Sequence, residues 1–285
     1  MTRLTPEMIR DVPSSSQGRD SSLARALGMT MKELAYTSVG IDLHELDMEG
    51  LTAACVPVTA GLGATAGFSE SVCAIVEHLG PKAYVTEETD VAGLGEALGS
   101  GADLIFMADD NEFLAINCRA RRAVNNIRST ALGYFTALRE AAGGLRGRDV
   151  LLIGAGRVGS CSAELLARNG AKVTVVDVDR SRAEALSSKY REFTVCDDLM
   201  EAVKGHDLIL NASPARIPGE WVQQGCVVSS PGMPFSFDEI GIRKMATLVH
   251  DPLQIGVSVM AVWSASLSLP RAPLLEGRAV WMEAI

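Results

Sequence analysis

Aromatic side chains and positive charge are both scarce in this chain of 285 residues. Phe, Trp and Tyr together make up 5% of it, which argues against a stacking platform for single-stranded nucleic acid. Asp and Glu outnumber Lys and Arg by 35 to 26, so the formal net charge is −9. Because such a surface repels phosphate backbones and anionic lipid headgroups, we expect neither a nucleic-acid partner nor a membrane.

Long apolar runs are missing as well. No stretch reaches the roughly 20 residues that a membrane-spanning helix needs. The first residues, MTRLTPEMIRDVPSSS, lack the apolar core of a secretory signal. The sequence therefore predicts a cytoplasmic protein.

The six cysteines form no CxxC pair and no Cys/His cluster at metal-binding spacing, so we expect no metal site. Glycine is abundant instead, with 27 residues, which favours tight turns and close approach of the backbone to a ligand. A chain of this length favours two domains.

The first fifty residues are predicted to form a helical arm. Thr5, Pro6 and Glu7 supply an N-cap, a proline in the first turn and an acidic side chain. Thr30 and Glu33 fit a capping box. Residues 14–18 lie between these two expected helix N-termini and predict a flexible connection. Such an arm could close as a lid or simply pack on the body.

A smaller α/β domain is expected to follow the arm. Apolar, β-rich runs alternate with helical patterns, which predicts a parallel sheet. The expected strands are residues 51–58, 83–85 and 104–107, and the expected helices are residues 69–79 and 90–98. Ligands of parallel sheets bind beyond the carboxyl ends of the strands, so a substrate pocket is predicted at residues 59–63, 86–87 and 109–110.

A long helix over residues 124–142 is predicted to lead into the second half. We place the division between two domains at residue 130, with residues 1–130 holding the substrate and residues 131–285 forming a Rossmann domain. Basic side chains precede this helix. These side chains either form a solvated surface or attract an anion. The residues are Arg119, Arg121, Arg122 and Arg128.

The second half opens with a dinucleotide-binding motif. A strand at 149–153 is followed by a GxGxxG loop, a helix at 160–169 and a second strand at 172–176 that ends in Asp177. The loop residues are Gly154, Ala155, Gly156, Arg157, Val158 and Gly159. Asp177 can accept hydrogen bonds from the ribose hydroxyls and would repel a 2′-phosphate, which favours NAD over NADP, although Arg180 lies close by. S-adenosylmethionine sites and nucleotide-free sheets use similar turns.

Three further strands are expected at residues 207–210, 226–229 and 247–250. The loops after the first two carry small residues that let a flat cofactor approach the backbone. These cofactor-side residues are Asn211, Ala212, Ser213, Pro214, Ser230 and Pro231. A last helix at 255–267 is predicted to bridge the two domains.

Acid–base residues are few at the predicted pocket. No lysine lies at the ends of the first-half strands, and among the four histidines only His250 lies at the end of an expected strand. Asp109 and Asp110 are the best titratable candidates. Because side chains alternate along a strand, we assign Asp109 to the pocket, where it suits a substrate with an ammonium group, and Asp110 to the N-cap of a helix that begins near Asn111.

The sequence resembles the pyrrolysine synthase family over about residues 1–265. The motifs that carry the resemblance are Leu4-Thr5-Pro6-Glu7, Val56-Pro57-Val58-Thr59, Gly67-Phe68-Ser69-Glu70-Ser71, Phe106-Met107-Ala108-Asp109-Asp110 and Asn125-Asn126, followed by the glycine loop. The resemblance implies an NAD-dependent oxidation of Nε-(3-methyl-D-ornithyl)-L-lysine, loss of ammonia and closure of the pyrroline ring. It also implies substrate contacts from Leu4, Thr59, Ala60, Leu62, Ser69, Asp109 and Asn126.

The sequence departs from the family pattern at a few of these positions. Ala60 and Leu62 stand where the family can carry polar side chains, and Ile127 stands where a glutamine can occur. The tail from about Ser266 extends beyond the family. Two other functions fit the same architecture: a dehydrogenase of another amine or amino acid, and an NAD-binding redox sensor without turnover.

Overall fold

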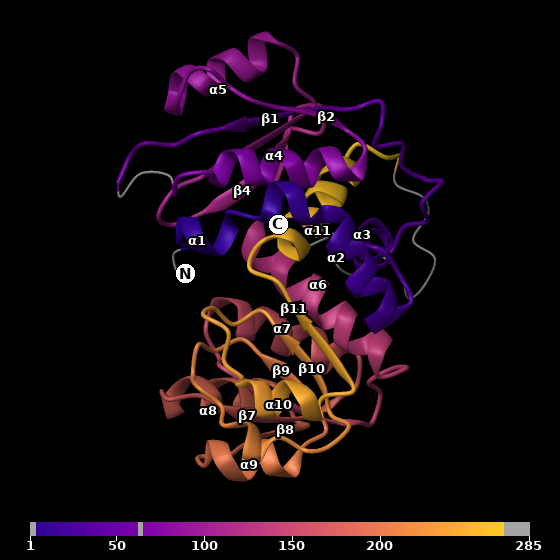
Figure 1. The fold of residues 1–285 in the computed structure, drawn as a ribbon, viewed down its shortest axis with the longest axis vertical. Coiled ribbons are helices and arrows are strands. Elements are labelled where there is room, and N and C mark those ends of the chain that lie inside the picture. Colours follow the sequence, from indigo (N-terminus) through magenta and orange to yellow (C-terminus); the bar gives the residue numbers. More distant parts are fainter. Residues whose placement is uncertain (1–3, 62–64, 271–285) are drawn as a thin grey trace.

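The computed structural model describes residues 4–61 and 65–270. Two β-sheets lie one above the other, and the helices α6 (Asn126–Ala141) and α11 (Gln254–Ser266) lie between them (Figure 1). The predicted α/β class, with a Rossmann domain and a smaller N-terminal α/β part, is confirmed. Within the described residues, no helix is both long and apolar enough to cross a membrane.

The first sheet has five strands in the order β2-β1-β3-β4-β5. Their bounds are β1 Thr52–Val56, β2 Lys82–Val85, β3 Leu104–Ala108, β4 Phe113–Asn117 and β5 Arg122–Asn125. β1 pairs in parallel with β2 and β3, as predicted. β4 and β5, which the sequence did not predict, add antiparallel pairings and make the sheet mixed. Of the basic residues, Arg119 and Arg121 lie in the turn between these two strands, Arg122 begins β5 and Arg128 lies inside α6.

A tight turn, not a helix, follows β3. The Asp109 carboxylate accepts hydrogen bonds from the backbone N–H groups of Asn111 and Glu112 at 2.8 and 2.7 Å. The Asp109 N–H in turn donates to the Glu112 carbonyl at 2.9 Å, and the chain returns directly into β4. The predicted helix near Asn111 and its N-cap at Asp110 are therefore wrong, because Asp109 closes a hairpin turn at this point.

Helices cover both faces of the first sheet. Ala54 and Val56 face α5 (Asp90–Gly99), whereas Ala53 and Cys55 point to the core shared with α4 (Phe68–Leu79) and α11. This alternation follows from the two-residue period of a strand. A fully covered strand explains the continuous apolar run at residues 51–58.

The N-terminal arm consists of α1 (Pro6–Ile9), α2 (Val12–Leu27) and α3 (Met31–Val39). The predicted capping box is present: the Thr30 side chain accepts from the Glu33 N–H, and the Glu33 carboxylate accepts from the Thr30 N–H. Residues 14–18 do not form the predicted flexible connection, because they lie inside α2. Tertiary contacts override the weak helix propensity of this serine-rich segment, since Ser15 accepts a hydrogen bond from Gln254 at 2.8 Å.

The second sheet has six parallel strands in the order β11-β10-β9-β6-β7-β8. They are β6 Asp149–Ile153, β7 Lys172–Val176, β8 Phe193–Val195, β9 Leu208–Asn211, β10 Val227–Ser230 and β11 Thr247–His250. The helices of this half are α7 Arg157–Arg168, α8 Arg180–Lys189, α9 Leu199–Gly205 and α10 Glu239–Lys244, with a short 3₁₀ helix at Gly219–Trp221. The order is that of a doubly wound Rossmann sheet.

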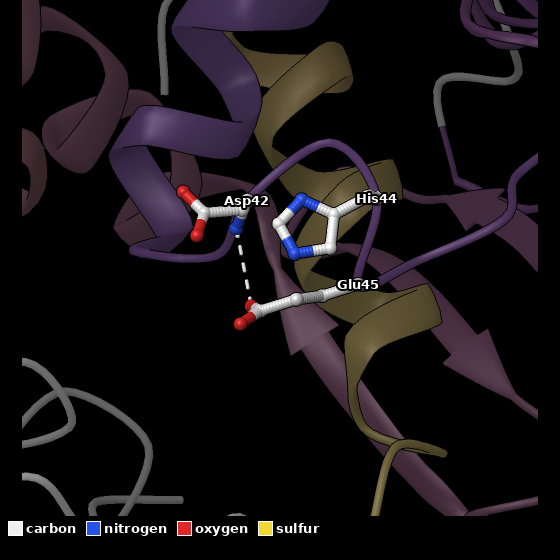
Figure 2. A group of neighbouring side chains, drawn as sticks. All are labelled: Asp42, His44 and Glu45. Carbon is white, nitrogen blue, oxygen red and sulfur yellow. Dashed lines mark hydrogen bonds between the residues drawn. The ribbon is translucent and has the colours of Figure 1, made fainter.

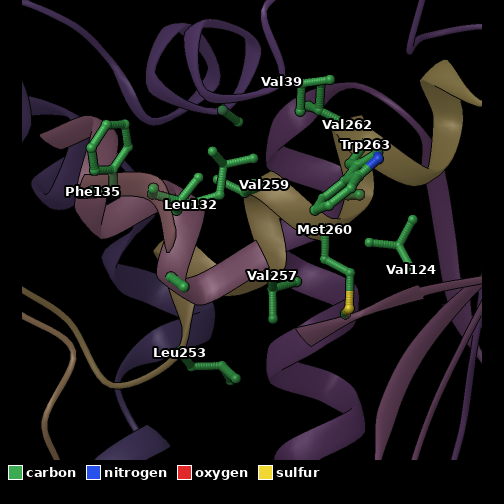
Figure 3. Close-up of a cluster of buried hydrophobic side chains, with 14 of the residues drawn as sticks. Val39, Val124, Leu132, Phe135, Leu253, Val257, Val259, Met260, Val262 and Trp263 are labelled. Atoms are coloured by element: carbon green, nitrogen blue, oxygen red, sulfur yellow. The ribbon is translucent and has the colours of Figure 1, made fainter. Parts of the chain in front are cut away.

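Two glycines let α6 and α11 cross closely. A Cβ atom on Gly133 of α6 would lie 2.7 Å from a methyl group of Ile255, and one on Gly256 of α11 would lie 2.5 Å from the Thr130 hydroxyl. Every residue of α11 is buried, and Figure 3 shows its apolar side chains against Leu132 and Phe135 of α6. Residue 130, where we expected the domain division, lies inside α6, and this helix contacts both sheets. The division at this residue stays a prediction.

Candidate active site

A cleft of about 630 Å³ lies between the two halves. Its walls come from the ends of β3 and β4, the first turns of α6, the glycine loop after β6 and the junction of β11 with α11. Its volume is in the range of small-molecule sites. The carboxyl ends of strands from both sheets thus open into one space, where a ligand bound by the second half can meet one bound by the first.

The glycine loop has the geometry that a dinucleotide requires. Gly154 has a φ of +91°, a left-handed conformation that favours glycine. A Cβ on Gly159 would lie 1.9 Å from the Gly154 carbonyl oxygen, so helix and strand pack closely here. A Cβ on Gly156 would meet nothing within 4 Å, which leaves room at the N-terminus of α7. Among the described residues no side chain caps that helix, so its first N–H groups can receive a phosphate.

Asp177 orders the same loop from the end of β7. One carboxylate oxygen accepts from the Ala155 N–H at 2.6 Å, and the other accepts from the Asp179 N–H at 2.8 Å. Arg180 is paired with the carboxylates of Glu184 and Asp197.

The other loops on the cofactor side contain two kinds of residue: some line the cleft, and others hold the loops in shape. Ala212, Pro214 and Pro231 line the cleft, together with residues 156–158. Asn211 is buried and donates to the hydroxyls of Ser230 and Ser236 at 3.2 and 2.8 Å. Asn211 also accepts from the Ser213 N–H at 3.2 Å. Asn211, Ser213 and Ser230 therefore hold the shape of these loops behind the lining residues.

Asp109 lines the opposite wall of the cleft. The N–H groups of Glu112 and Asn111 lower the pKa of its carboxyl, so the side chain stays ionised near neutral pH. Its neighbour Asp110 also lines the cleft and lies against Gly61, where an added Cβ would be 2.2 Å from the carboxylate.

The remaining predicted substrate residues fall in different places. Leu4 and Asn126 line the cleft. Ser69 lines a small adjoining cavity of about 10 Å³ with Phe68 and Phe113. Thr59 and Ala60 are exposed and lie outside the cleft lining, and Leu62 lies outside the described residues.

Thr59 is held by a strained aspartate. Its N–H and hydroxyl donate to the Asp90 carboxylate at 2.8 and 2.5 Å, and these bonds lower the pKa of Asp90. Asp90 itself has a φ of +54°, which is uncommon for a residue with a side chain.

The sequence reasoning missed two lining residues of α6. Thr130 and Tyr134 follow Asn126 at intervals of four residues, so all three share one helix face along the cleft. That spacing could have revealed them once Asn126 was chosen. Asn126 presents a buried side-chain oxygen that has no hydrogen-bond partner among the described residues.

One cluster outside the cleft has metal-binding residue types. Asp42, His44 and Glu45 follow α3, and their potential ligand atoms lie within 4.8 Å of one another (Figure 2). All three side chains are exposed, and the Glu45 carboxylate accepts from the Asp42 N–H at 3.1 Å. Exposed carboxylates commonly gather in this way at turns, so we assign the cluster no role.

Family models match both halves of the chain. Residues 8–124 match the family "Pyrrolysine biosynthesis protein PylD, N-terminal domain", and residues 136–225 match "Shikimate / quinate 5-dehydrogenase". Among solved structures, the chain resembles quinate dehydrogenase from Corynebacterium glutamicum in complex with NAD. The TM-score is 0.53 at 16% identity, covering 76% of this chain and 93% of that one, which shows a shared fold.

Curated relatives match over nearly their whole length. The chain is 31% identical over 268 residues to pyrrolysine synthase from Methanosarcina acetivorans, covering 91% of this chain and 98% of the relative. It is also 31% identical over 265 residues to pyrrolysine synthase from Methanosarcina barkeri, covering 91% and 97%. With its N-terminal half matched by the corresponding family model, this chain belongs to the pyrrolysine synthase family.

Proposed function

We propose that this chain is a cytoplasmic, NAD-dependent oxidoreductase that completes pyrrolysine biosynthesis, with Nε-(3-methyl-D-ornithyl)-L-lysine as its substrate. The observation that carries the proposal is the single cleft that joins the glycine loop to Asp109. Family membership supports the substrate, since the two curated relatives are named pyrrolysine synthase.

The dinucleotide would lie against Gly156, Arg157, Val158, Ala212, Pro214 and Pro231. Bound there, it would accept a hydride from the terminal amine carbon of the ornithine part. Support for NAD over NADP comes from Asp177, whose carboxylate sits beside the loop and would repel a 2′-phosphate. Arg180 is paired with two carboxylates and therefore contributes little attraction toward a 2′-phosphate.

Asp109 is the proposed catalytic residue on the substrate side. An ionised carboxylate attracts an ammonium group, and the pKa of Asp109 is already lowered by two backbone N–H groups. Asn126 would accept a further hydrogen bond through its unpartnered oxygen. Five further residues are proposed to contact the substrate because the family resemblance implies it: Leu4, Thr59, Ala60, Leu62 and Ser69.

The overall conversion balances without another oxidant. Loss of a hydride from carbon and a proton from nitrogen gives an imine, which water hydrolyses to an aldehyde and ammonia. The ornithyl α-amine then condenses with the aldehyde, forms the ring C=N bond and releases water. Ring closure needs little catalysis, because the two reacting groups already belong to one molecule. This small demand fits the described lining of the cleft, which holds no histidine, lysine or cysteine.

The test is to incubate the purified protein with the precursor and NAD. We expect NADH and pyrrolysine to form in equal amounts, measured by absorbance and by mass spectrometry. Folded protein that yields no NADH from this precursor would overturn the proposal. A panel of other amines and amino acids, run in parallel, separates this function from that of a general amine dehydrogenase.

A further inference from the structure

Arg157 joins the glycine loop to the opposite wall of the cleft. It is the first residue of α7, and its guanidinium donates to the Asn111 carbonyl at 2.9 Å through Nη1. Nη2 pairs with one carboxylate oxygen of Glu112. Both acceptors belong to the turn between β3 and β4, so one side chain connects the two halves of the molecule.

The turn that Arg157 contacts is the one that Asp109 closes. Asp109 holds the N–H groups of Asn111 and Glu112, and it accepts both through the same oxygen. Arg157 and Asp109 thus contact the same two residues of the turn, Asn111 and Glu112.

Glu112 also reaches the first turn of α6. Its second carboxylate oxygen accepts from the side-chain amide of Asn125. Asn125 caps α6, because its side-chain oxygen accepts from the Ile127 N–H at 2.7 Å. Arg157, Glu112 and Asn125 thus link the glycine loop to two elements of the substrate wall.

The pair between Arg157 and Glu112 can be exchanged at low cost. Their side chains are 50% and 43% exposed, and ion pairs of that exposure contribute on the order of 1 kcal/mol or less. Arg157 stands at the N-terminus of a helix, where the pyrophosphate of a dinucleotide is expected to bind. A pyrophosphate carries more negative charge than a single carboxylate and offers bidentate acceptors to a guanidinium.

We infer that Arg157 is a positioning residue that couples dinucleotide binding to the position of the Asp109 turn. The pyrophosphate draws the guanidinium away from Glu112 and Asn111 and thereby releases the turn toward the substrate. The dinucleotide consequently binds before the substrate. This inference rests on the proposed function, because it takes the glycine loop as the dinucleotide site.

The test measures the Kd of ADP-ribose, which carries the pyrophosphate but no reactive nicotinamide. Four proteins are compared: the unmodified chain, Glu112→Gln, Arg157→Gln and the double variant. Glu112→Gln frees Arg157 for the pyrophosphate, so we expect it to bind ADP-ribose about two- to fivefold more tightly, the range that a half-exposed ion pair allows. In the Arg157→Gln background the same Glu112 substitution is expected to change nothing.

Glu164→Gln is the matched control, because Glu164 forms an exposed pair with Arg168 on the same helix, away from the cleft. It is expected to leave the Kd unchanged, and equal thermal midpoints verify that all variants are folded. Equal Kd values for Glu112→Gln and the unmodified chain would overturn the coupling. So would equal tightening with and without Arg157, which would reflect net charge alone. Failure of the unmodified chain to bind ADP-ribose would instead overturn the proposed cofactor site itself.

Discussion

The hydroxyl of Tyr134 makes two hydrogen bonds with the backbone of Asp251. It donates to the Asp251 carbonyl at 2.5 Å and accepts from the Asp251 N–H at 2.8 Å. Burial raises the pKa of this hydroxyl, so it keeps its proton. The contact fixes the junction of β11 with α11 against α6, and the floor of the cleft is built from these elements.

Tyr134→Phe is therefore expected to destabilise the protein by about 1–3 kcal/mol, because it leaves a buried carbonyl and N–H unpaired. Denaturant unfolding measures the free energy. Tyr84→Phe is the control, since the Tyr84 hydroxyl is buried without a partner among the described residues. Its removal is expected to be neutral or stabilising, and equal losses for both variants would contradict this account.

Gly133→Ala is expected to destabilise the protein by about 1–3 kcal/mol, the usual cost of overpacking a tight core. The new methyl group would lie 2.7 Å from one methyl group of Ile255 and 3.0 Å from one of Val259, both inside the crossing of α6 with α11. The change in stability is measured by thermal unfolding.

Gly95→Ala provides the contrast for that substitution. Gly95 also lies inside a helix, but a Cβ there would meet nothing within 4 Å. We expect this variant to gain about 0.5–1 kcal/mol from the reduced freedom of the unfolded chain. A gain in stability in Gly133→Ala as well as in Gly95→Ala would show that the helix crossing is not tight.

How far the sequence predicted these features depends on the range of the interactions. The glycine loop, the strand before it and Asp177 were correctly ordered, because each has a local conformational or chemical requirement. The capping box of Thr30 is local in the same way. Five of the six strands described in the second half followed from alternating strand and helix patterns, whereas β8 (Phe193–Val195) was not predicted.

The sequence did not predict features that depend on contacts between residues far apart in the chain. Residues 14–18 carry poor helix formers, yet contacts with α11 from more than two hundred residues away hold them in α2. The hairpin of β3 and β4 was missed because an aspartate before a polar residue signals a helix N-cap and a turn equally well. The pair between Arg157 and Glu112 joins residues 45 positions apart and has no local signature.

The stability of the protein is expected to depend on His250 at mildly acidic pH. Burial lowers the pKa of His250 from its usual value near 6.5, although its hydrogen bond with the Ser230 carbonyl opposes this shift. The unfolded chain therefore binds a proton that the folded chain resists, and this contribution to stability is lost as the pH falls below about 6.5.

We compare the free energy of unfolding at about pH 7.5 and about pH 5.5, on either side of the ordinary histidine pKa. The drop is expected to be smaller in His250→Asn than in the unmodified chain. An identical drop in the two proteins would assign the pH dependence to other groups.

Cofactor choice is expected to depend on Asp177. Replacing it with Asn removes one negative charge beside the expected 2′-position, so NADP should bind about fivefold better relative to NAD, since a solvent-exposed charge pair is worth about 1 kcal/mol. The Kd values of both dinucleotides are measured by titration. Arg180→Gln is the companion variant: because Arg180 is held by Glu184 and Asp197, it should leave the ratio unchanged. An unchanged ratio in Asp177→Asn would remove the basis for NAD preference.

The most direct test of the central claim is the effect of Asp109→Ala on turnover and on NAD binding in the same protein. Asp109 and the glycine loop face each other across one cleft but serve different ligands. We predict loss of NADH formation from the lysyl-ornithine precursor, with a Kd for NAD within about fivefold of that of the unmodified chain, the range that release of Arg157 from the turn allows. Full activity in Asp109→Ala would contradict the account and remove Asp109 from the reaction.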